Sequence, residues 1–337
     1  MLVLGIETSC DECSVALVED GVSLSGMLIA TQDEVHAPYS GVVPELASRR
    51  HVETIFPIYQ EVLKGAGCRP ADIDLVAVTV QPGLAGSLAV GVAFAKALAL
   101  GLGRPVVGVD HISAHLYAIQ LERKVAYPFL GLVISGGHTL IARCLSPTEF
   151  EVLGTTIDDA CGEAFDKVAK HLELGYPGGV AIDRLARRGD PRAFRFPVPS
   201  LHKGDHRYDV SYSGLKTAVV NQLEQFRNPG YEATPENIAA GFEASAVDMA
   251  LNRLRKAQKD TRMGRIVVAG GVASNSYLRS RLSDWKGAEV FVPSKRLCTD
   301  NGAMVAGLGY HVYRERGAGN LDLDIVPKVP EFRGNYP

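Results

Sequence analysis

The feature that most constrains the fold is an arrangement of strands, turns and a helix that occurs twice along the chain. Each copy has an apolar strand, a polar or glycine-rich hairpin, two further strands and then a helix. The strands are residues 2–6, 14–18 and 23–29 in the first copy, and residues 129–134, 140–144 and 150–153 in the second. The similarity is one of pattern rather than of residue identity, and it predicts an internal duplication of an α/β fold.

The two helices that follow these strands have recognisable starts. The first is expected to begin near Pro44, and the second at Asp158 or Asp159. Pro57 should kink the first helix, and the glycines of residues 65–67 should end it. Its buried face is expected to carry the apolar residues at three- and four-residue spacing: Val52, Ile55, Tyr59 and Val62.

Further strands and helices extend each copy. The first continues with strands at residues 73–80 and 105–109 around an apolar segment, residues 84–102. Because that segment contains Lys96 and many small residues, we interpret it as a buried helix rather than a membrane span. The second continues with a helix at residues 236–259, a strand at 266–269, a helix around 277–282, a strand at 290–292 and a last helix that opens within 298–304.

This order of elements predicts two lobes, residues 1–125 and 126–337. The final helix, from about residue 300, is the part of the second lobe that could pack back on the first. Thr299 or Asp300 is expected to be its N-cap, because both residue types accept hydrogen bonds from the first turn of a helix.

Composition and charge exclude several classes of protein. The chain has 337 residues and a formal net charge of −3, so it is not a polycation that grips nucleic acid by itself. Its first seven residues have neither the basic region nor the cleavage site of a signal peptide. Six cysteines are scattered, and the CxxC of Cys10 and Cys13 has no second pair to complete a zinc site. We therefore expect reduced thiols and a cytoplasmic enzyme.

An irregular basic stretch interrupts the second lobe. Residues 184–207 carry roughly five net positive charges and several prolines, within a predicted insertion at about residues 175–230. Two interpretations stay open: a solvated loop, or a surface that faces an anion or an RNA backbone. Arg187, Arg188 and Arg192 are the side chains that the second interpretation would use.

Two histidines directly follow the strand that ends near Asp110. If the chain turns helical there, His111 and His115 fall one turn apart on one face and could share a metal ion. The alternative is a pair of histidines that are satisfied within the protein. No glutamate follows His111, so this is not the His-Glu-x-x-His motif of zinc peptidases, in which the glutamate is the general base.

Three turns at strand ends could bring the backbone close to a phosphate or an adenine: residues 9–12, 135–137 and 270–271. None of them matches the Rossmann or P-loop patterns. Two lobes with such hairpins instead resemble the actin, Hsp70 and sugar-kinase superfamily (the ASKHA, ribonuclease H-like fold), in which a nucleotide lies in the cleft between two duplicated lobes.

Within that superfamily the chain resembles the TsaD family of tRNA N6-adenosine threonylcarbamoyltransferases over nearly its whole length. The motifs that carry the resemblance are residues 5–12, 41–49, His111 with His115, residues 135–139, 158–167, 176–179, 211–217, 270–272 with Asn275, and 298–304.

The resemblance implies a set of site residues. It implies a metal, Fe²⁺ or Zn²⁺, held by His111, His115 and, from the second lobe, Asp300. It places Asp11 and Glu12 at the reacting end, where a carboxylate could take a proton from the attacking amine. The residues implied to bind threonylcarbamoyl-AMP are Val133, Ile134, Ser135, Gly136, Gly137, Asp166, Gly179, Asp183 and Asn275.

The implied reaction is transfer of the threonylcarbamoyl group from threonylcarbamoyl-AMP to N6 of adenosine 37, in tRNAs that read codons starting with adenine. The implied partners are tRNA, the shorter paralogue TsaB, paired through helices of the first lobe, and the ATPase TsaE. Two alternatives stay open from the residues alone. One is a metallopeptidase of the O-sialoglycoprotein endopeptidase type, and the other is an ATP-binding, chaperone-like module.

Overall fold

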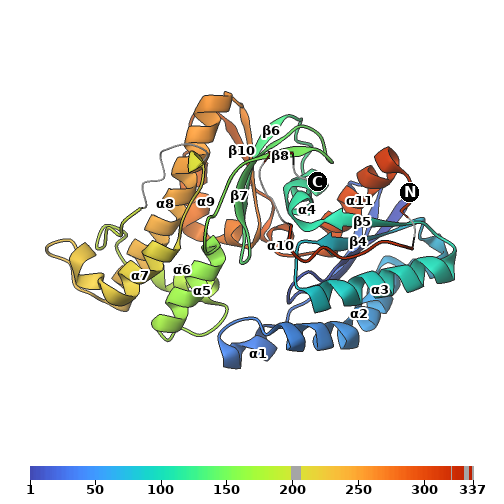
Figure 1. Ribbon diagram of the computed structural model, residues 1–337, viewed down its shortest axis with the longest axis horizontal. Helices are drawn as coiled ribbons and strands as arrows, with labels where there is room; N and C mark the ends of the chain where they lie inside the picture. The colour runs from blue at the N-terminus through green and yellow to red at the C-terminus, as the bar shows by residue number, and fades with distance from the viewer. Residues whose placement is uncertain (199–205, 320, 330–333, 336–337) are drawn as a thin grey trace. The chain divides into compact units, whose positions relative to one another are not determined.

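The computed structural model describes residues 1–198, 206–319, 321–329 and 334–335 (Figure 1). The chain forms two compact units. Unit 1 comprises Met1–Tyr127, Leu145–Phe150 and the segment that begins at Arg296. Unit 2 comprises Pro128–Cys144 and Glu151–Lys295. The chain therefore builds most of unit 1, builds unit 2, and then returns to unit 1.

Unit 1 is built on a five-stranded sheet in the order β3-β2-β1-β4-β5. β1 pairs antiparallel with β2, and parallel with β4, which continues the parallel pairing to β5. The strands are β1 Leu2–Glu7, β2 Cys13–Glu19, β3 Ser23–Ala30, β4 Leu75–Gln81 and β5 Val106–Asp110.

Helices cover both faces of this sheet, because side chains alternate between the faces along each strand (Figure 1). On one face, Leu4 and Ile6 pack with α2 (Pro44–Ala66) and α3 (Ala85–Leu102). On the other face, Val3 and its neighbours pack with α4 (His111–Tyr117) and α11 (Gly302–Arg316). The predicted strand and helix pattern of the first copy is confirmed.

Helix α2 begins at Pro44 and ends at Ala66, followed by Gly67 in the left-handed conformation, as predicted, with Pro57 inside the helix. Its inward face differs at one position. Ile55, Tyr59 and Val62 are buried, but Val52 is 63% exposed, and His51 takes the inward position instead. A hydrogen bond from His51 to the backbone explains this placement, because a buried imidazole needs a polar partner.

Helix α3 is long and apolar enough to cross a membrane, and it is the only such helix in the described part of the chain. Six of its residues, including Leu88, Val92 and Ala95, are nevertheless buried along one side, where the helix packs against α2 and β4. Leu100 on the other side is 68% exposed. This distribution is that of a helix with one face in a protein core.

Unit 2 repeats the strand order of unit 1. Its sheet has the order β10-β9-β6-β7-β8-β11, so β6 to β10 match β1 to β5 one for one. β6 again pairs antiparallel with the next strand and parallel with β9. The strands are β6 Phe129–Ile134, β7 Thr139–Cys144, β8 Phe150–Thr155, β9 Arg265–Ala269, β10 Glu289–Phe291 and β11 Gly334–Asn335. The predicted duplication is confirmed at the level of topology.

The long helices of unit 2 gather beside its sheet (Figure 1). They are α5 Cys161–His171, α6 Gly178–Ala186, α7 Ser213–Asn221, α8 Pro235–Thr261 and α9 Ser276–Ser283. Helix α5 starts later than predicted, and α6 occupies residues that we placed in the insertion, the last of them in its irregular stretch. The short helices of the whole chain are α1 Asp33–His36, η1 Ala37–Tyr39, η2 Pro70–Asp72, η3 Ala118–Leu121, η5 Leu223–Phe226, η6 Gly271–Ser274 and α10 Lys295–Cys298.

Candidate metal centre

Helix α4 presents both histidines of the sequence motif. Asp110 is its N-cap: the carboxylate accepts hydrogen bonds from the Ser113 backbone N–H at 2.7 Å and from its hydroxyl at 2.8 Å. The helix therefore starts at His111, as the spacing predicts. His111 and His115 lie one turn apart, with ring centroids separated by 4.5 Å.

Asp300 reaches the histidines from the segment that returns to unit 1. Asn301, rather than Thr299 or Asp300, caps α11 by accepting a hydrogen bond from the Met304 N–H. The Gly302 N–H donates to Ser14 Oγ on β2 at 2.9 Å. Asp300 thus lies in the same unit as both histidines, and the expectation that it comes from the second lobe is wrong. The reason is that α11 packs on the first sheet.

The start of α11 lies against β1 through two glycines. A Cβ on Gly5 would lie 2.0 Å from the Gly302 carbonyl oxygen and 2.5 Å from the Ala306 nitrogen. A Cβ on Gly302 would lie 2.7 Å from the Gly5 carbonyl oxygen. Only a residue without a side chain fits at either position. This close approach fixes where Asp300 sits.

The three side chains form a group that could hold a metal ion. Their ligand atoms all lie within 4.8 Å of one another. Asp300 Oδ1 is 3.0 Å from His115 Nε2 and 3.6 Å from His111 Nε2. Both histidines are buried, and the Asp300 side chain is 18% exposed. Two imidazole nitrogens and one carboxylate, converging with one side toward water, suit a divalent transition metal with open coordination positions.

Glu7, at the end of β1, lies against His111, and no pattern in the sequence singled it out. Its carboxylate is fully buried, and its Oε2 lies 3.1 Å from His111 Nδ1. Burial opposes protonation of His111, but the carboxylates of Asp300 and Glu7 outweigh it and raise the pKa of His111 to about 9. Burial also opposes ionisation of Glu7, yet the His111 ring keeps the pKa of Glu7 below its ordinary value. Without a metal the two form an ion pair.

The hairpin between β1 and β2 carries Asp11 and Glu12. His51 Nε2 lies 2.9 Å from the Cys10 carbonyl oxygen, and this hydrogen bond ties the hairpin to α2. Removal from water, and then the nearby carboxylates of Asp11 and Asp300, raise the pKa of Glu12 well above its ordinary value. Burial likewise raises the pKa of Cys10 and takes that of Cys13 to about 12, so neither thiol is a ready thiolate ligand.

In unit 2, five of the residues implied to bind the substrate lie at the end of β6 and in the turn that follows it. Val133 and Ile134 are buried in the strand, and Ser135 begins the turn to β7. Gly136 and Gly137 are exposed, and a Cβ on either would meet open space. The turn is held by α5, because the Gly162 N–H donates to the Ser135 carbonyl oxygen and the Glu163 N–H to that of Gly136.

Asp166 and Gly179 come together at the start of α6. Asp166 Oδ1 accepts a hydrogen bond from the Gly178 N–H at 2.8 Å. A Cβ on Gly178 would lie 2.7 Å from the Asp166 Cα, so the two helices touch at this point. Gly179 is open on its outer side, where an added Cβ would meet nothing within 4 Å.

Asp183 and Asn275 meet at the start of α9. Asp183 Oδ1 accepts hydrogen bonds from the Ser276 backbone N–H at 2.9 Å and from its hydroxyl at 2.5 Å. Asn275 Oδ1 caps α9 by accepting from the Leu278 N–H, and its Nδ2 donates to buried Glu243 at 2.6 Å. Removal from water raises the pKa of Glu243 to about 7. Sequence patterns gave no signal for Glu243, because it sits mid-helix in α8.

Asp158 fixes the loop before α5 to the start of α7. Its Oδ2 accepts from the Ser211 and Ser213 hydroxyls at 2.5 and 2.8 Å, and its Oδ1 from the Tyr212 N–H at 2.7 Å. Burial opposes ionisation of Asp158, but these hydrogen bonds outweigh it and hold the pKa of its carboxyl below its ordinary value.

Replacing Asp158 by alanine is therefore expected to destabilise the protein by about 1 kcal/mol at neutral pH, since hydrogen bonds to an exposed carboxylate are worth little more. The lowered pKa makes this contribution complete above the unfolded-state pKa of about 4, and it is lost as the pH falls through the native value. Urea unfolding of both proteins between pH 7 and pH 3 measures the difference. A gap that stays constant below pH 4 would contradict the assignment.

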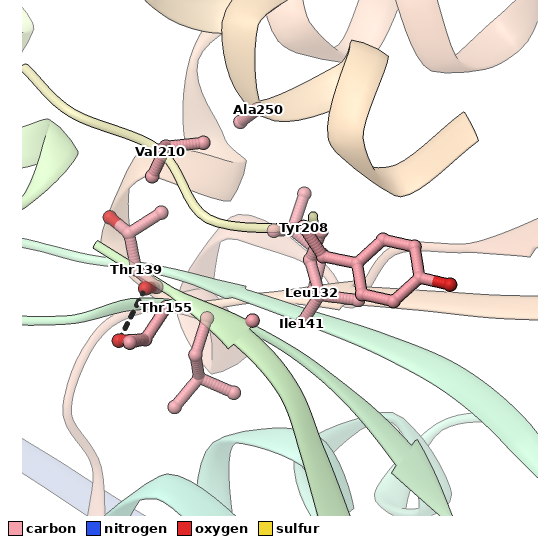
Figure 2. Close-up of a pocket in the computed structure, with 9 residues that line it drawn as sticks. Leu132, Thr139, Ile141, Thr155, Tyr208, Val210 and Ala250 are labelled. Atoms are coloured by element: carbon pink, nitrogen blue, oxygen red, sulfur yellow. Dashed lines mark hydrogen bonds between the residues drawn. The ribbon is translucent and has the colours of Figure 1, made fainter. Parts of the chain in front are cut away.

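The apolar pocket of unit 2 is too small for a substrate (Figure 2). Its volume is about 10 Å³, roughly what one water molecule needs. Figure 2 shows that Leu132, Ile141 and Val210 contribute carbon atoms to it, and that the Thr155 hydroxyl donates to the Thr139 carbonyl oxygen. None of the site residues proposed from the sequence lines it.

The basic stretch is partly neutralised where the structure describes it, and residues 199–205 lie outside the described residues. Arg187 pairs with Asp183 at 2.5 Å, Arg188 with Glu236 at 3.4 Å, and Arg192 with Asp190 at 2.7 Å. Arg184 and Arg195 are exposed and form no ion pair within the described ranges. These two are therefore better placed than the first three to neutralise a phosphate.

Comparison with solved structures shows the fold class of the chain. The chain aligns with HypF from T. kodakarensis at a TM-score of 0.64 and 14% identity, covering 96% of this chain and 49% of that one. It aligns with component A of (R)-2-hydroxyglutaryl-CoA dehydratase from Acidaminococcus fermentans at a TM-score of 0.57 and 16% identity, covering 92% of this chain and 98% of that one. With its duplicated sheets, the chain has the actin-like ASKHA fold.

The family follows from sequence. The family model for TsaD, tRNA N6-adenosine threonylcarbamoyltransferase, matches residues 24–307. A protein of that description from Treponema denticola is 54% identical over 317 residues, 94% of each chain. Another, from Borrelia garinii subsp. bavariensis, is 48% identical over 336 residues, covering 100% of this chain and 99% of its own. The chain therefore belongs to the TsaD family, and it is a transferase that threonylcarbamoylates N6 of adenosine in tRNA.

Proposed function

We propose that the chain uses threonylcarbamoyl-AMP as donor and modifies adenosine 37 of tRNAs that read codons starting with adenine. The observation that carries this proposal is the convergence of His111, His115 and Asp300 in a chain of the TsaD family. A zinc peptidase of the His-Glu-x-x-His type would need a glutamate beside His111, and the neighbouring residue is Ile112. An ATP-binding, chaperone-like module would not account for the convergence of His111, His115 and Asp300.

The donor set of His111, His115 and Asp300 fits Fe²⁺ or Zn²⁺. When bound, such an ion would hold the threonylcarbamoyl group and polarise its carbonyl as a Lewis acid. The chain's own residues supply the proton chemistry. Asp11 or Glu12, on the hairpin after β1, would accept the proton that the adenosine amine loses as it attacks the carbamoyl carbon. AMP leaves with the electrons of the broken bond.

The turn after β6 and the starts of α6 and α9 are proposed to bind the donor nucleotide. Gly136, Gly137 and Gly179 leave the backbone open to a close approach by a ligand. Asp166 and Asp183 already hold neighbouring backbone groups. A carboxylate can accept about four hydrogen bonds in all, so a ribose hydroxyl is a chemically suitable donor to either side chain. Asn275 is proposed to contact the donor from the α9 cap.

We propose that TsaB and TsaE are partners of this chain in the cytoplasm, and that TsaB pairs through α2. Val52 and Phe56 support a contact there, because they are 63% and 52% exposed and lie one turn apart on the outer face of this helix. The formal net charge of −3 supports a need for partners, since tRNA affinity comes largely from phosphate neutralisation.

The test is a transfer assay with labelled threonylcarbamoyl-AMP and tRNA, run with the chain alone and with both partners. We expect slow or no turnover alone and restored turnover in the complex. Labelled casein, supplied in parallel, reports the peptidase alternative. Multiple turnover by the isolated chain at physiological salt would refute the need for partners. Cleavage of casein without transfer to tRNA would refute the proposal that threonylcarbamoyl-AMP is the donor.

The tRNA surface has its own test. Reversing charge at Arg184 and Arg195 is expected to weaken tRNA binding by the complex and to reduce its salt dependence, by roughly one unit of slope for each phosphate that is no longer neutralised. Reversing Arg192, which is already paired with Asp190, is the matched control and should have the smaller effect. Equal salt slopes in all three proteins would place the RNA surface elsewhere.

A further inference from the structure

Glu7 is a buried carboxylate at the end of β1 whose two oxygens both have hydrogen-bond partners. Its Oε1 accepts from the Ser9 backbone N–H at 2.6 Å. Its Oε2 accepts from the Thr79 hydroxyl at 2.6 Å and lies 3.1 Å from His111 Nδ1. The side chain is fully buried, so these hydrogen bonds hold it in one orientation. The same carboxylate thus touches the metal ligand His111 and the start of the hairpin that carries Asp11 and Glu12.

We propose that Glu7 is a positioning residue for the metal: it keeps the proton of metal-bound His111 on Nδ1, so that Nε2 is the ligating nitrogen. The proposal rests on the proposed metal site of His111, His115 and Asp300. His111 Nδ1 lies 3.1 Å from Glu7 Oε2 and 3.2 Å from the Ser9 hydroxyl oxygen. A carboxylate accepts hydrogen bonds and donates none, whereas a hydroxyl can also accept, so a proton on Nδ1 satisfies both neighbours. The nitrogen left for the metal is Nε2, which is the atom that faces Asp300.

His115 provides an internal contrast. Its Nε2 also faces Asp300, but its Nδ1 is buried and has no hydrogen-bond partner among the described residues. The two ligands are therefore not equivalent. The ring of His111 is oriented by a fixed carboxylate, whereas that of His115 is oriented by its packing in α4. Glu7 is consequently a carboxylate that would act on the metal through a ligand, His111.

Glutamine at position 7 separates this role from simple packing. Glutamine has the shape of glutamate, but one oxygen becomes an NH₂ group. If its oxygen stays on the Ser9 N–H, its NH₂ group faces His111 Nδ1 and donates to it, which places the imidazole proton on Nε2 and blocks the metal. If the amide flips, its NH₂ group faces the Ser9 N–H, so two hydrogen-bond donors lie against each other and the hydrogen bond is lost. Keeping the hydrogen bond from the Ser9 N–H therefore favours the orientation in which the glutamine NH₂ group faces His111 and metal binding through His111 Nε2 is blocked.

The experiment measures Zn²⁺ affinity of the full chain by competition with a chromogenic chelator, for the wild type and Glu7→Gln. We expect Glu7→Gln to bind Zn²⁺ roughly 10–100-fold more weakly, the range found when the outer partner of a metal-bound histidine is removed. Asp74→Asn is the matched control. Asp74 accepts from the Leu2 N–H at the other end of β1, so its change tests strand stability without touching His111.

A second measurement keeps the proposal falsifiable if Glu7→Gln does not fold. In the zinc-loaded wild type, nitrogen-15 NMR of the imidazoles should show His111 protonated on Nδ1 and ligated through Nε2. Ligation through Nδ1 would overturn the proposal, and so would an unchanged affinity in folded Glu7→Gln. Failure of the wild type itself to bind Zn²⁺, Fe²⁺ or Co²⁺ would overturn the metal site and this inference together, whereas binding that ignores Glu7 would overturn this inference alone.

Discussion

Replacing His115 by alanine is expected to remove most of the bound metal and to lower transfer activity by more than about 100-fold. His115 supplies one of three converging ligand atoms, 3.0 Å from Asp300, and losing a ligand should cost more than losing an outer partner of one. Asp300→Asn should have the same effect, because it removes the anionic ligand while keeping the size of the side chain. Metal analysis of the purified proteins and the transfer assay measure the two losses.

A second histidine of the same unit is the matched control. His311 lies on α11, and its Nε2 is 2.9 Å from the Tyr117 hydroxyl rather than near the metal group. His311→Ala should therefore keep wild-type metal content, although it removes less packing, because His311 is half-buried and His115 is fully buried. Full occupancy in His115→Ala would exclude the proposed ligand set, and equal metal loss in His311→Ala would show that general destabilisation is the cause.

Replacing Gly5 by alanine is expected to destabilise the protein by about 1–3 kcal/mol or more, the cost of overpacking a core. The new Cβ would meet the backbone of Gly302 and Ala306, which cannot turn aside as a flexible side chain can. The start of α11 must then move away from β1, and Asp300 moves with it. We therefore expect a lower midpoint of thermal unfolding together with weaker metal binding.

The matched control for this change is Gly65, a glycine in the last turn of α2. An added Cβ at Gly65 meets nothing within 4 Å, so Gly65→Ala should be neutral or slightly stabilising. Metal titration and thermal unfolding of the two variants compare them directly. If Gly5→Ala kept the wild-type melting temperature and metal affinity, the close approach of the two glycines would not be what places Asp300.

Local patterns were sufficient to predict most of the fold. The strands of both copies and α2 were predicted because apolar periodicity and proline or glycine boundaries are local signals. The start of α4 was predictable for the same reason, since Asp110 caps it. Helix α6 was missed because its sequence begins with glycines and runs into a cluster of arginines. Burial of Ile182 and Leu185 against α8 stabilises it, and that packing is tertiary.

The candidate metal site was predictable only in part. The pair of His111 and His115 is visible as a spacing, and family resemblance added Asp300. The sequence left open whether the final helix packs back on the first lobe, so it could not assign Asp300 to unit 1, which depends on α11 packing on the first sheet. Glu7 was missed for a similar reason. It is separated from His111 by 104 positions and meets it only because β1, β4 and β5 are neighbours in the sheet.

The return of the chain to unit 1 has a consequence for biosynthesis. A ribosome that has finished residues 1–127 has made one sheet and both histidines, but the helix that covers one face of that sheet is still unmade. Roughly 170 residues separate the two segments, which is on the order of ten seconds or more at a translation rate of about 5–20 residues per second. During that time Val3, Ala77 and Val107 have no α11 to cover them. Capture of a metal by all three proposed ligands would therefore be a late event, available only to chains that were translated past Asp300.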